Sequence, residues 1–215
     1  MINTPDQSVS ILGYIDRKRY LWMLSTLWPA TPMIGLWLVA QTGWTIWYAL
    51  VLIVWYAMVP LLDAMFGEDF NNPPEEAVEM LEKDRYYRVL TYLTVPIHYA
   101  ALIVAAWWVS THAMSWLEII TLALSLGIVN GLALNTGHEL GHKKETFDCW
   151  LAKLVLAVAG YGHFFIEHNK GHHRAVVTPM DHATARIGEG YYTLSTRATL
   201  PYTLLPTHHT IPELL

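Results

Sequence analysis

The sequence predicts an all-α integral membrane protein, built as a bundle of about four transmembrane helices. Of the 215 residues, 53% are hydrophobic and 14% are charged, whereas soluble domains carry roughly 25% charged residues. The hydrophobic residues also gather in four runs, each close to the roughly 20 residues that a helix needs to cross the hydrocarbon core of a bilayer. Together these two observations indicate a helical membrane protein.

In chain order, the four predicted spans are residues 21–40, 44–62, 89–109 and 116–134. None of them contains Lys, Arg or Asp, and two residues weaken the assignment of a span: His98 within the third and Glu118 at the start of the fourth. Prolines occur within the spans, and membrane helices tolerate proline better than soluble helices do. Residues 71–88, between the second and third spans, are polar and predict a solvated connector.

The basic residues predict the orientation. All 13 Lys and Arg residues precede the first span, lie between the second and third, or follow the fourth, and the connections 41–43 and 110–115 have none. Loops rich in Lys and Arg stay in the cytoplasm. We therefore expect a multi-pass protein whose amino terminus and carboxy-terminal part are both cytoplasmic.

A fifth apolar stretch, residues 150–166, follows the fourth span. It is short and contains Lys153 and His163, so we predict an interfacial or re-entrant helix on the cytoplasmic side rather than another crossing.

The composition also excludes several classes of function. The net charge is −5 and no basic stripe is present, which argues against a partner made of nucleic acid. The single cysteine, Cys149, excludes an intrachain disulfide framework and a cysteine-based metal site.

Five histidines after the fourth span form two clusters with the spacing of metal ligands. His138 and His142 are four residues apart, which places both on one face of a helix. His168 and His172 repeat that spacing, and His173 lies about 100° further around an α-helix. Imidazole-rich sites suit iron, zinc or copper. The pattern therefore predicts a metal centre at the cytoplasmic end of the bundle, with iron-dependent oxygen chemistry on a lipophilic substrate.

The first cluster also fits the H-E-x-x-H pattern of zinc proteases, with Glu139 as the general base. A catalytic zinc site needs three protein ligands, whereas five histidines in two blocks are available here. This favours a two-metal centre, and an intramembrane zinc protease remains the alternative.

At these clusters the sequence resembles a known family. Residues 135–148, NTGHELGHKKETFD, are similar to the first histidine box of the bacterial membrane alkane 1-monooxygenases, and residues 160–174, GYGHFFIEHNKGHHR, to the second. The resemblance extends to about residue 192, so we expect a membrane hydroxylase domain over 1–192 and a divergent tail over 193–215. Fatty-acyl desaturases and xylene-type monooxygenases share the boxes but usually not this wording, and are the related alternatives.

This resemblance implies terminal hydroxylation of a medium-chain alkane to a primary alcohol at a centre of two non-haem iron ions. It implies dioxygen as co-substrate and electrons from rubredoxin, which rubredoxin reductase reduces with NADH. It also implies a place in the bacterial inner membrane, where the alkane arrives from the lipid bilayer. By the same resemblance, the metal ligands are His138, His142, His168, His172 and His173.

The sequence departs from the family in one respect. A third histidine box and an Asn-Tyr-x-Glu-His-Tyr-Gly motif are absent, so we expect these 215 residues alone to form a partial metal site with little or no hydroxylation. Neither Asp181 nor His182 is assigned as a ligand. Trp55 lies in the middle of the second span, and we predict that it lines the substrate channel and limits alkane length.

Overall fold

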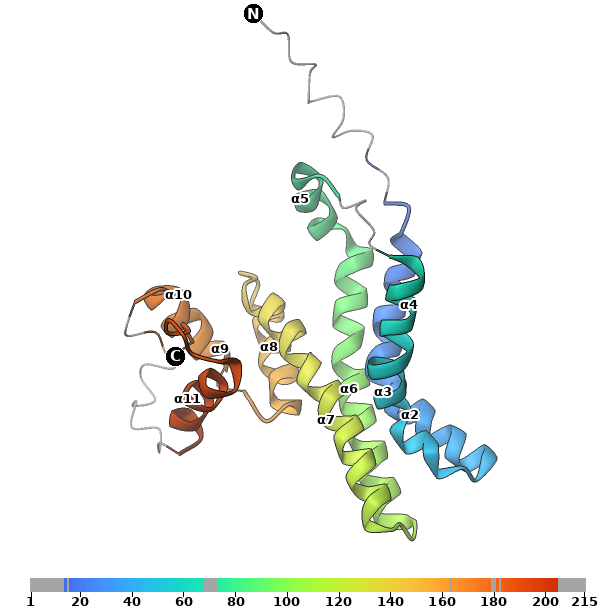
Figure 1. The fold of residues 1–215 in the computed structure, drawn as a ribbon. Coiled ribbons are helices and arrows are strands. Elements are labelled where there is room, and N and C mark those ends of the chain that lie inside the picture. Colours follow the sequence, from blue (N-terminus) through green and yellow to red (C-terminus); the bar gives the residue numbers. More distant parts are fainter. Residues whose placement is uncertain are drawn as a thin grey trace, which may run out of the picture. The chain divides into compact units, whose positions relative to one another are not determined.

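The computed structural model describes residues 14, 16–67, 73–162, 164–178, 181 and 183–204, and these contain helices and no strands (Figure 1). They belong to two compact units, residues 1–136 and residues 137–215. Four helical segments in the described part are long and apolar enough to cross a membrane: Arg19–Thr42, Thr45–Phe66, Arg85–Thr111 and Trp116–Gly141. The predicted all-α membrane fold is confirmed, and each predicted span overlaps one of these segments, although the second segment begins one residue later than predicted and continues to Phe66.

The first segment comprises a short 3-10 helix, η1 (Arg19–Met23), and α2 (Leu24–Thr42), which contains Pro29 and Pro32. It ends at Gly43, which adopts a φ of 72° while its N–H donates to the carbonyl of Val39. Glycine adopts this left-handed conformation at little cost, so it ends helices efficiently.

The second segment is irregular. It passes from a 3-10 helix, η2 (Thr45–Ala49), through α3 (Leu50–Ile53) and a π-helix, η3 (Val54–Met58), into α4 (Val59–Phe66). Pro60, the second residue of α4, has no N–H to donate to the preceding turn. The π-turn accommodates this missing bond, and it contains Trp55.

The connector forms α5 (Glu75–Lys83), and the third segment is α6 (Arg85–Thr111), whose amino terminus is capped by Asp84. The Asp84 carboxylate accepts from the N–H of Tyr86 and, at 2.5 Å, from the guanidinium of Arg19. These bonds hold the pKa of Asp84 below its ordinary value. The ion pair joins the beginnings of the first and third segments, and α2 packs along α6 (Figure 1).

The fourth segment, α7 (Trp116–Gly141), begins with a capping box. The hydroxyl and the backbone N–H of Ser115 both donate to Glu118 Oε2, and the backbone N–H of Glu118 donates to Ser115 Oγ. Such a box satisfies N–H groups that have no partner within the helix. Glu118, the polar exception in the predicted span, therefore has a structural function at its end.

The core of the first unit contains buried Leu36, Tyr48, Ala105, Trp108 and Leu122. Trp108 Nε1 donates to the Tyr48 hydroxyl at 3.1 Å, and Ser125 Oγ from α7 donates to the Tyr48 carbonyl at 2.7 Å. Polar bonds between buried groups are needed here because neither water nor lipid can satisfy them.

The second unit contains α8 (Thr146–Val158), α9 (Phe164–Ile166), a π-helix η4 (Glu167–His172), α10 (His173–Ala175) and α11 (Tyr191–Leu204). Residues 150–166, which the sequence predicts as an interfacial or re-entrant helix, are divided in the structure. Their first part belongs to α8, which begins at Thr146 and ends at Val158, and their last part is α9. The reason is Gly160, at φ 70°, where the N–H groups of Gly160 and Tyr161 bond back to Ala157 and Leu156. This is a Schellman motif.

A close backbone approach at Gly35 generates a stability prediction. A Cβ at this position would lie 2.5 Å from the Trp47 carbonyl oxygen of η2. Because that atom belongs to the backbone, Gly35→Ala should separate the first two segments at a cost of about 1–3 kcal/mol. We expect a lower thermal midpoint in detergent by circular dichroism.

The matched control is Gly131→Ala. Gly131 is exposed on α7, and a Cβ there would meet no atom within 4 Å. Alanine favours helix over glycine, so the midpoint should stay level or rise. Equal loss in both variants would contradict the close-approach argument.

Candidate metal centre

The first pair of histidines lies at the carboxy-terminal end of α7. His138 is in the last turn of that helix and His142 follows it directly, with ring centroids 4.7 Å apart. The end of α7 lies against α8, because a Cβ on Gly137 would come within 2.5 Å of the Leu156 side chain. Glycine thus permits α8 to support the turn that carries both imidazoles.

The second cluster lies in the π-helix η4, and its pairing differs from the one that α-helical spacing predicts. In a π-turn the hydrogen bonds join residues five apart, and His173 as well as His172 lies beside His168, with ring centroids 4.5 Å and 5.5 Å away. The His168 and His173 Nε2 atoms are 3.0 Å apart. Asn169, in the same π-helix, donates from Nδ2 to the Gly141 carbonyl at 3.4 Å and anchors the second cluster to the first.

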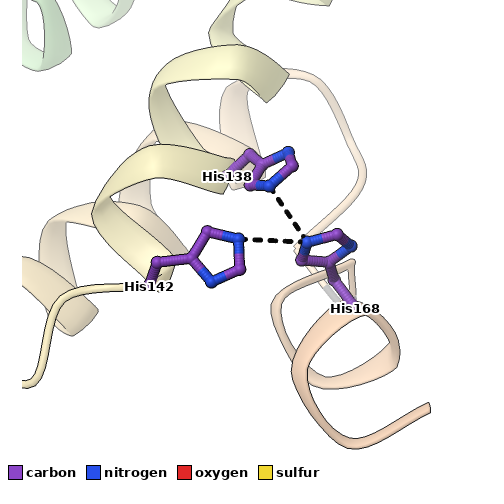
Figure 2. A group of neighbouring side chains, drawn as sticks. All are labelled: His138, His142 and His168. Carbon is purple, nitrogen blue, oxygen red and sulfur yellow. Dashed lines mark hydrogen bonds between the residues drawn. The ribbon is translucent and has the colours of Figure 1, made fainter. Parts of the chain in front are cut away.

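The imidazoles converge on the His168 ring (Figure 2). His168 Nε2 lies 3.0 Å from His138 Nε2 and 3.3 Å from His142 Nε2. The ligand atoms of these three residues all lie within 4.8 Å of one another. Among the described residues they form a group able to hold a metal ion, and they come from both predicted clusters.

This donor set fits a borderline metal such as iron or zinc. A neutral imidazole has one N–H donor and one acceptor nitrogen, so His168 Nε2 cannot form hydrogen bonds to three other ring nitrogens at once. A shared cation removes the conflict, since nitrogens bound to one ion at about 2.1 Å are themselves about 3 Å apart.

Two histidines of the cluster, His142 and His168, have lowered pKa values. Partial burial, followed by repulsion from His138, His173 and the other imidazoles, lowers the pKa of His168 to about 4. Burial and the same neighbours lower the pKa of His142 as well. Both rings are therefore neutral at pH 7, and only the neutral ring has a lone pair for a metal.

His172 is oriented by a carboxylate. Its Nδ1 donates to Asp181 Oδ2 at 2.9 Å, and the Asp181 side chain is 3% exposed. Burial by itself would raise the pKa of Asp181, but hydrogen bonds from Thr184, Ala183 and His172 outweigh it, and the net pKa lies below the ordinary value.

Asp181, which the sequence did not assign as a ligand, contacts a predicted ligand, His172, in the structure. It lies nine residues after His172, outside any helical spacing, and its proximity depends on the turn that follows α10. The available signal was its place in the run TPMD, residues 178–181, which resembles the same family as the histidine boxes. Glu139, by contrast, is exposed and pairs with Lys143 at 2.8 Å.

The other residues singled out from the sequence lie outside the cluster. Trp55 belongs to the first unit, where its ring meets Trp28 edge-on with centroids 4.5 Å apart. His98 is buried in the first unit, as expected of a packed histidine. His163 and His182 lie outside the described residues.

The chain is similar to known proteins over most of its length. The chain is 77% identical over 184 residues to alkane 1-monooxygenase of Pseudomonas putida and 78% identical over 184 residues to that of Ectopseudomonas oleovorans. The chain is a homologue of the alkane 1-monooxygenases. More distant alkane 1-monooxygenases also match, such as that of Acinetobacter baylyi, with 40% identity over 184 residues, or 83% of this chain and 44% of the relative. No family model matches the chain.

The alignments with the Pseudomonas putida and Ectopseudomonas oleovorans alkane 1-monooxygenases cover 86% of this chain and 46% of each relative. The chain therefore spans about half the length of the curated relatives that it matches. The matched part includes most of the residues that form the four apolar segments and the histidine cluster, since 86% of the chain is aligned.

The central place of His168 predicts a specific loss of metal. Replacing His168 with Ala removes the nitrogen that faces three other imidazoles, so metal affinity should fall by more than the 10–100-fold typical of residues outside the ligand set. The measurement is bound Fe²⁺ per chain after dialysis, by atomic emission.

His112→Ala is the control, because His112 stacks on Trp108 in the first unit. It should retain the metal of the unaltered chain. Unchanged metal content in the His168→Ala variant would show that the convergence is not a binding site.

Proposed function

We propose that this protein is a membrane monooxygenase that converts the terminal methyl group of a medium-chain alkane into a primary alcohol. The observation that carries the proposal is the convergence of His138, His142 and His168 in a chain 75–78% identical to proteins named alkane 1-monooxygenase. The related desaturase and aromatic-methyl alternatives gain no support from the matched names.

Two non-haem iron ions are assigned to the histidine cluster. His138, His142 and His168 hold the ions together with His173, which faces the same His168 Nε2 atom, and with His172, whose ring stacks on that of His168. Iron, when bound, supplies the activation of dioxygen that an alkane C–H bond requires. The protein lowers the pKa of His142 and of His168 and turns these rings, with that of His138, toward a common centre.

The substrate reaches the site from the membrane in this proposal. An alkane has no group for hydrogen bonding and partitions into lipid, and four apolar segments give the protein a place there. Apolar contacts discriminate by only about 1–3 kcal/mol per methylene, so the shape of the channel has to select the terminal carbon.

We further propose that the amino terminus and the metal site face the cytoplasm across the bacterial inner membrane. The positive-inside rule supports this orientation, since the connections after the first and third segments contain neither Lys nor Arg. The cytoplasmic side is where rubredoxin, reduced by rubredoxin reductase and NADH, would deliver electrons.

Hydroxylation is tested in a chimaera, because the chain spans about half of its relatives. The matched segment of the Pseudomonas putida relative is replaced by this chain, and cells that carry the chimaera receive octane. We expect 1-octanol by gas chromatography, and none from the His138→Ala chimaera. Absence of product from a chimaera that accumulates normally and binds iron would contradict the proposal. The chain alone, assayed in parallel, tests the expectation of little or no turnover.

Glu139→Gln separates this proposal from a zinc protease. The Glu139 carboxylate is exposed and pairs with Lys143, so an oxygenase should keep most of its 1-octanol formation in this variant. A protease that uses Glu139 as the general base would lose its activity outright. Complete loss of hydroxylation in Glu139→Gln, with iron retained, would contradict the assigned roles.

Trp55 is proposed to narrow the hydrocarbon channel. Its half-buried ring packs on Trp28 within the π-turn, and its Nε1 has no hydrogen-bond partner among the described residues. Trp55→Ser in the chimaera should raise the ratio of hexadecane to octane turnover. Trp37→Ser, at a tryptophan that is 60% exposed, is the matched control and should leave the ratio unchanged. An equal ratio of hexadecane to octane turnover in the two variants would show that Trp55 does not narrow the channel.

A further inference from the structure

We propose that Asp181 is a positioning residue that fixes the His172 ring so that Nε2, and not Nδ1, binds metal. The inference rests on the proposed function, since it takes His172 as a ligand of the iron centre. It adds to that function a residue outside both histidine clusters, together with the loop that holds it.

The geometry of the contact determines the tautomer. Asp181 Oδ2 lies 2.9 Å from His172 Nδ1, and an ionised carboxylate only accepts hydrogen bonds. Nδ1 must therefore carry the proton, which leaves the lone pair of the neutral ring on Nε2. Metal-binding histidines commonly donate their other N–H to a carboxylate in this way, which fixes ring orientation and raises ligand basicity.

The Asp181 carboxylate is itself held from several sides. Oδ1 accepts from the N–H of Ala183 at 3.0 Å, and Oδ2 also accepts from the Thr184 hydroxyl. Thr184 Oγ1 in turn accepts from the N–H of Val177 at 3.2 Å. All of the partners of the carboxylate donate to it, and together they hold it in the orientation in which Oδ2 accepts from His172.

The turn that carries Asp181 is locked by an ion pair. Arg197, on α11, donates to the Thr184 carbonyl at 2.9 Å and to both carboxylate oxygens of Glu189 at 2.8 Å. The Glu189 side chain is 6% exposed, and Arg197 lowers its pKa to about 2. Helix α11, which continues into the predicted divergent tail, thus holds Thr184 and the turn that places Asp181 beside His172.

Asp181→Asn tests the inference because the amide cannot serve all three donors. If its oxygen faces His172, its NH₂ faces the N–H of Ala183. If its oxygen faces Ala183, its NH₂ faces His172 and favours the tautomer with the proton on Nε2. We expect the affinity of the chain in detergent for Co²⁺, followed by its visible absorption, to fall by about 10–100-fold.

A second readout needs no metal. In the metal-free chain labelled with ¹⁵N-histidine, with His172→Gln used to assign the signal, His172 should be the Nδ1–H tautomer by NMR. Asp181→Asn should shift it toward Nε2–H. A purely structural role for Asp181 would leave the tautomer unchanged.

Two further variants complete the design. Glu139→Gln makes the same carboxylate-to-amide change beside the cluster, at a side chain paired with Lys143, and should leave both the tautomer and the Co²⁺ affinity unaltered. Thr184→Val keeps the charge of Asp181 but removes one donor, so it should give a smaller change in the same direction. It also provides a result if Asp181→Asn loses its helical circular dichroism.

The outcomes separate the two claims. Co²⁺ binding by the unaltered chain, with the same affinity and tautomer in Asp181→Asn, would overturn the role of Asp181 and leave the proposed function standing. No Co²⁺ binding by the unaltered chain would count against the proposed function. In that case the tautomer of His172, compared between the unaltered chain and Asp181→Asn, would still show whether Asp181 orients the His172 ring.

Discussion

Unprotonated imidazole nitrogens repel one another at 3.0–3.3 Å unless a cation or a shared proton lies between them, and this constraint shapes the second unit. His168 Nε2 faces the Nε2 atoms of His138, His142 and His173 at such distances. The partial burial that lowers the pKa of His168 makes protonation a poor remedy near pH 7. In the proposed function a metal ion makes the arrangement favourable, and metal binding and the folding of this unit should then be coupled.

The surrounding structure holds the imidazoles where that repulsion would otherwise separate them. Gly137 lets the end of α7 approach Leu156 of α8, and Asn169 ties η4 to the carbonyl of Gly141. The buried carboxylate of Asp181 then fixes His172. Each of these contacts joins residues that are distant in the sequence, and each acts on ring orientation more than on the overall fold.

The first unit meets a different requirement, because its backbone polar groups have to be satisfied without water. At the starts of two helices, Ser115 and Glu118 form a capping box and the Asp84 carboxylate accepts from the N–H of Tyr86. The π-turn around Trp55 is the irregular place in this unit. Such turns often occur at functional sites, and the proposed channel role of Trp55 depends on it.

The sequence by itself determined the membrane class, the four spans and the identity of the histidines, because hydrophobic run length and residue type act locally. It also indicated the first pair correctly, since His138 and His142 follow α-helical spacing. It did not indicate that His173 faces His168 Nε2, because a π-turn is not visible in a spacing of four. Only the tertiary structure decided that His173 faces His168 and that Asp181 holds His172. Those contacts depend on turns at Gly160 and after α10, which bring together residues that no periodic pattern connects.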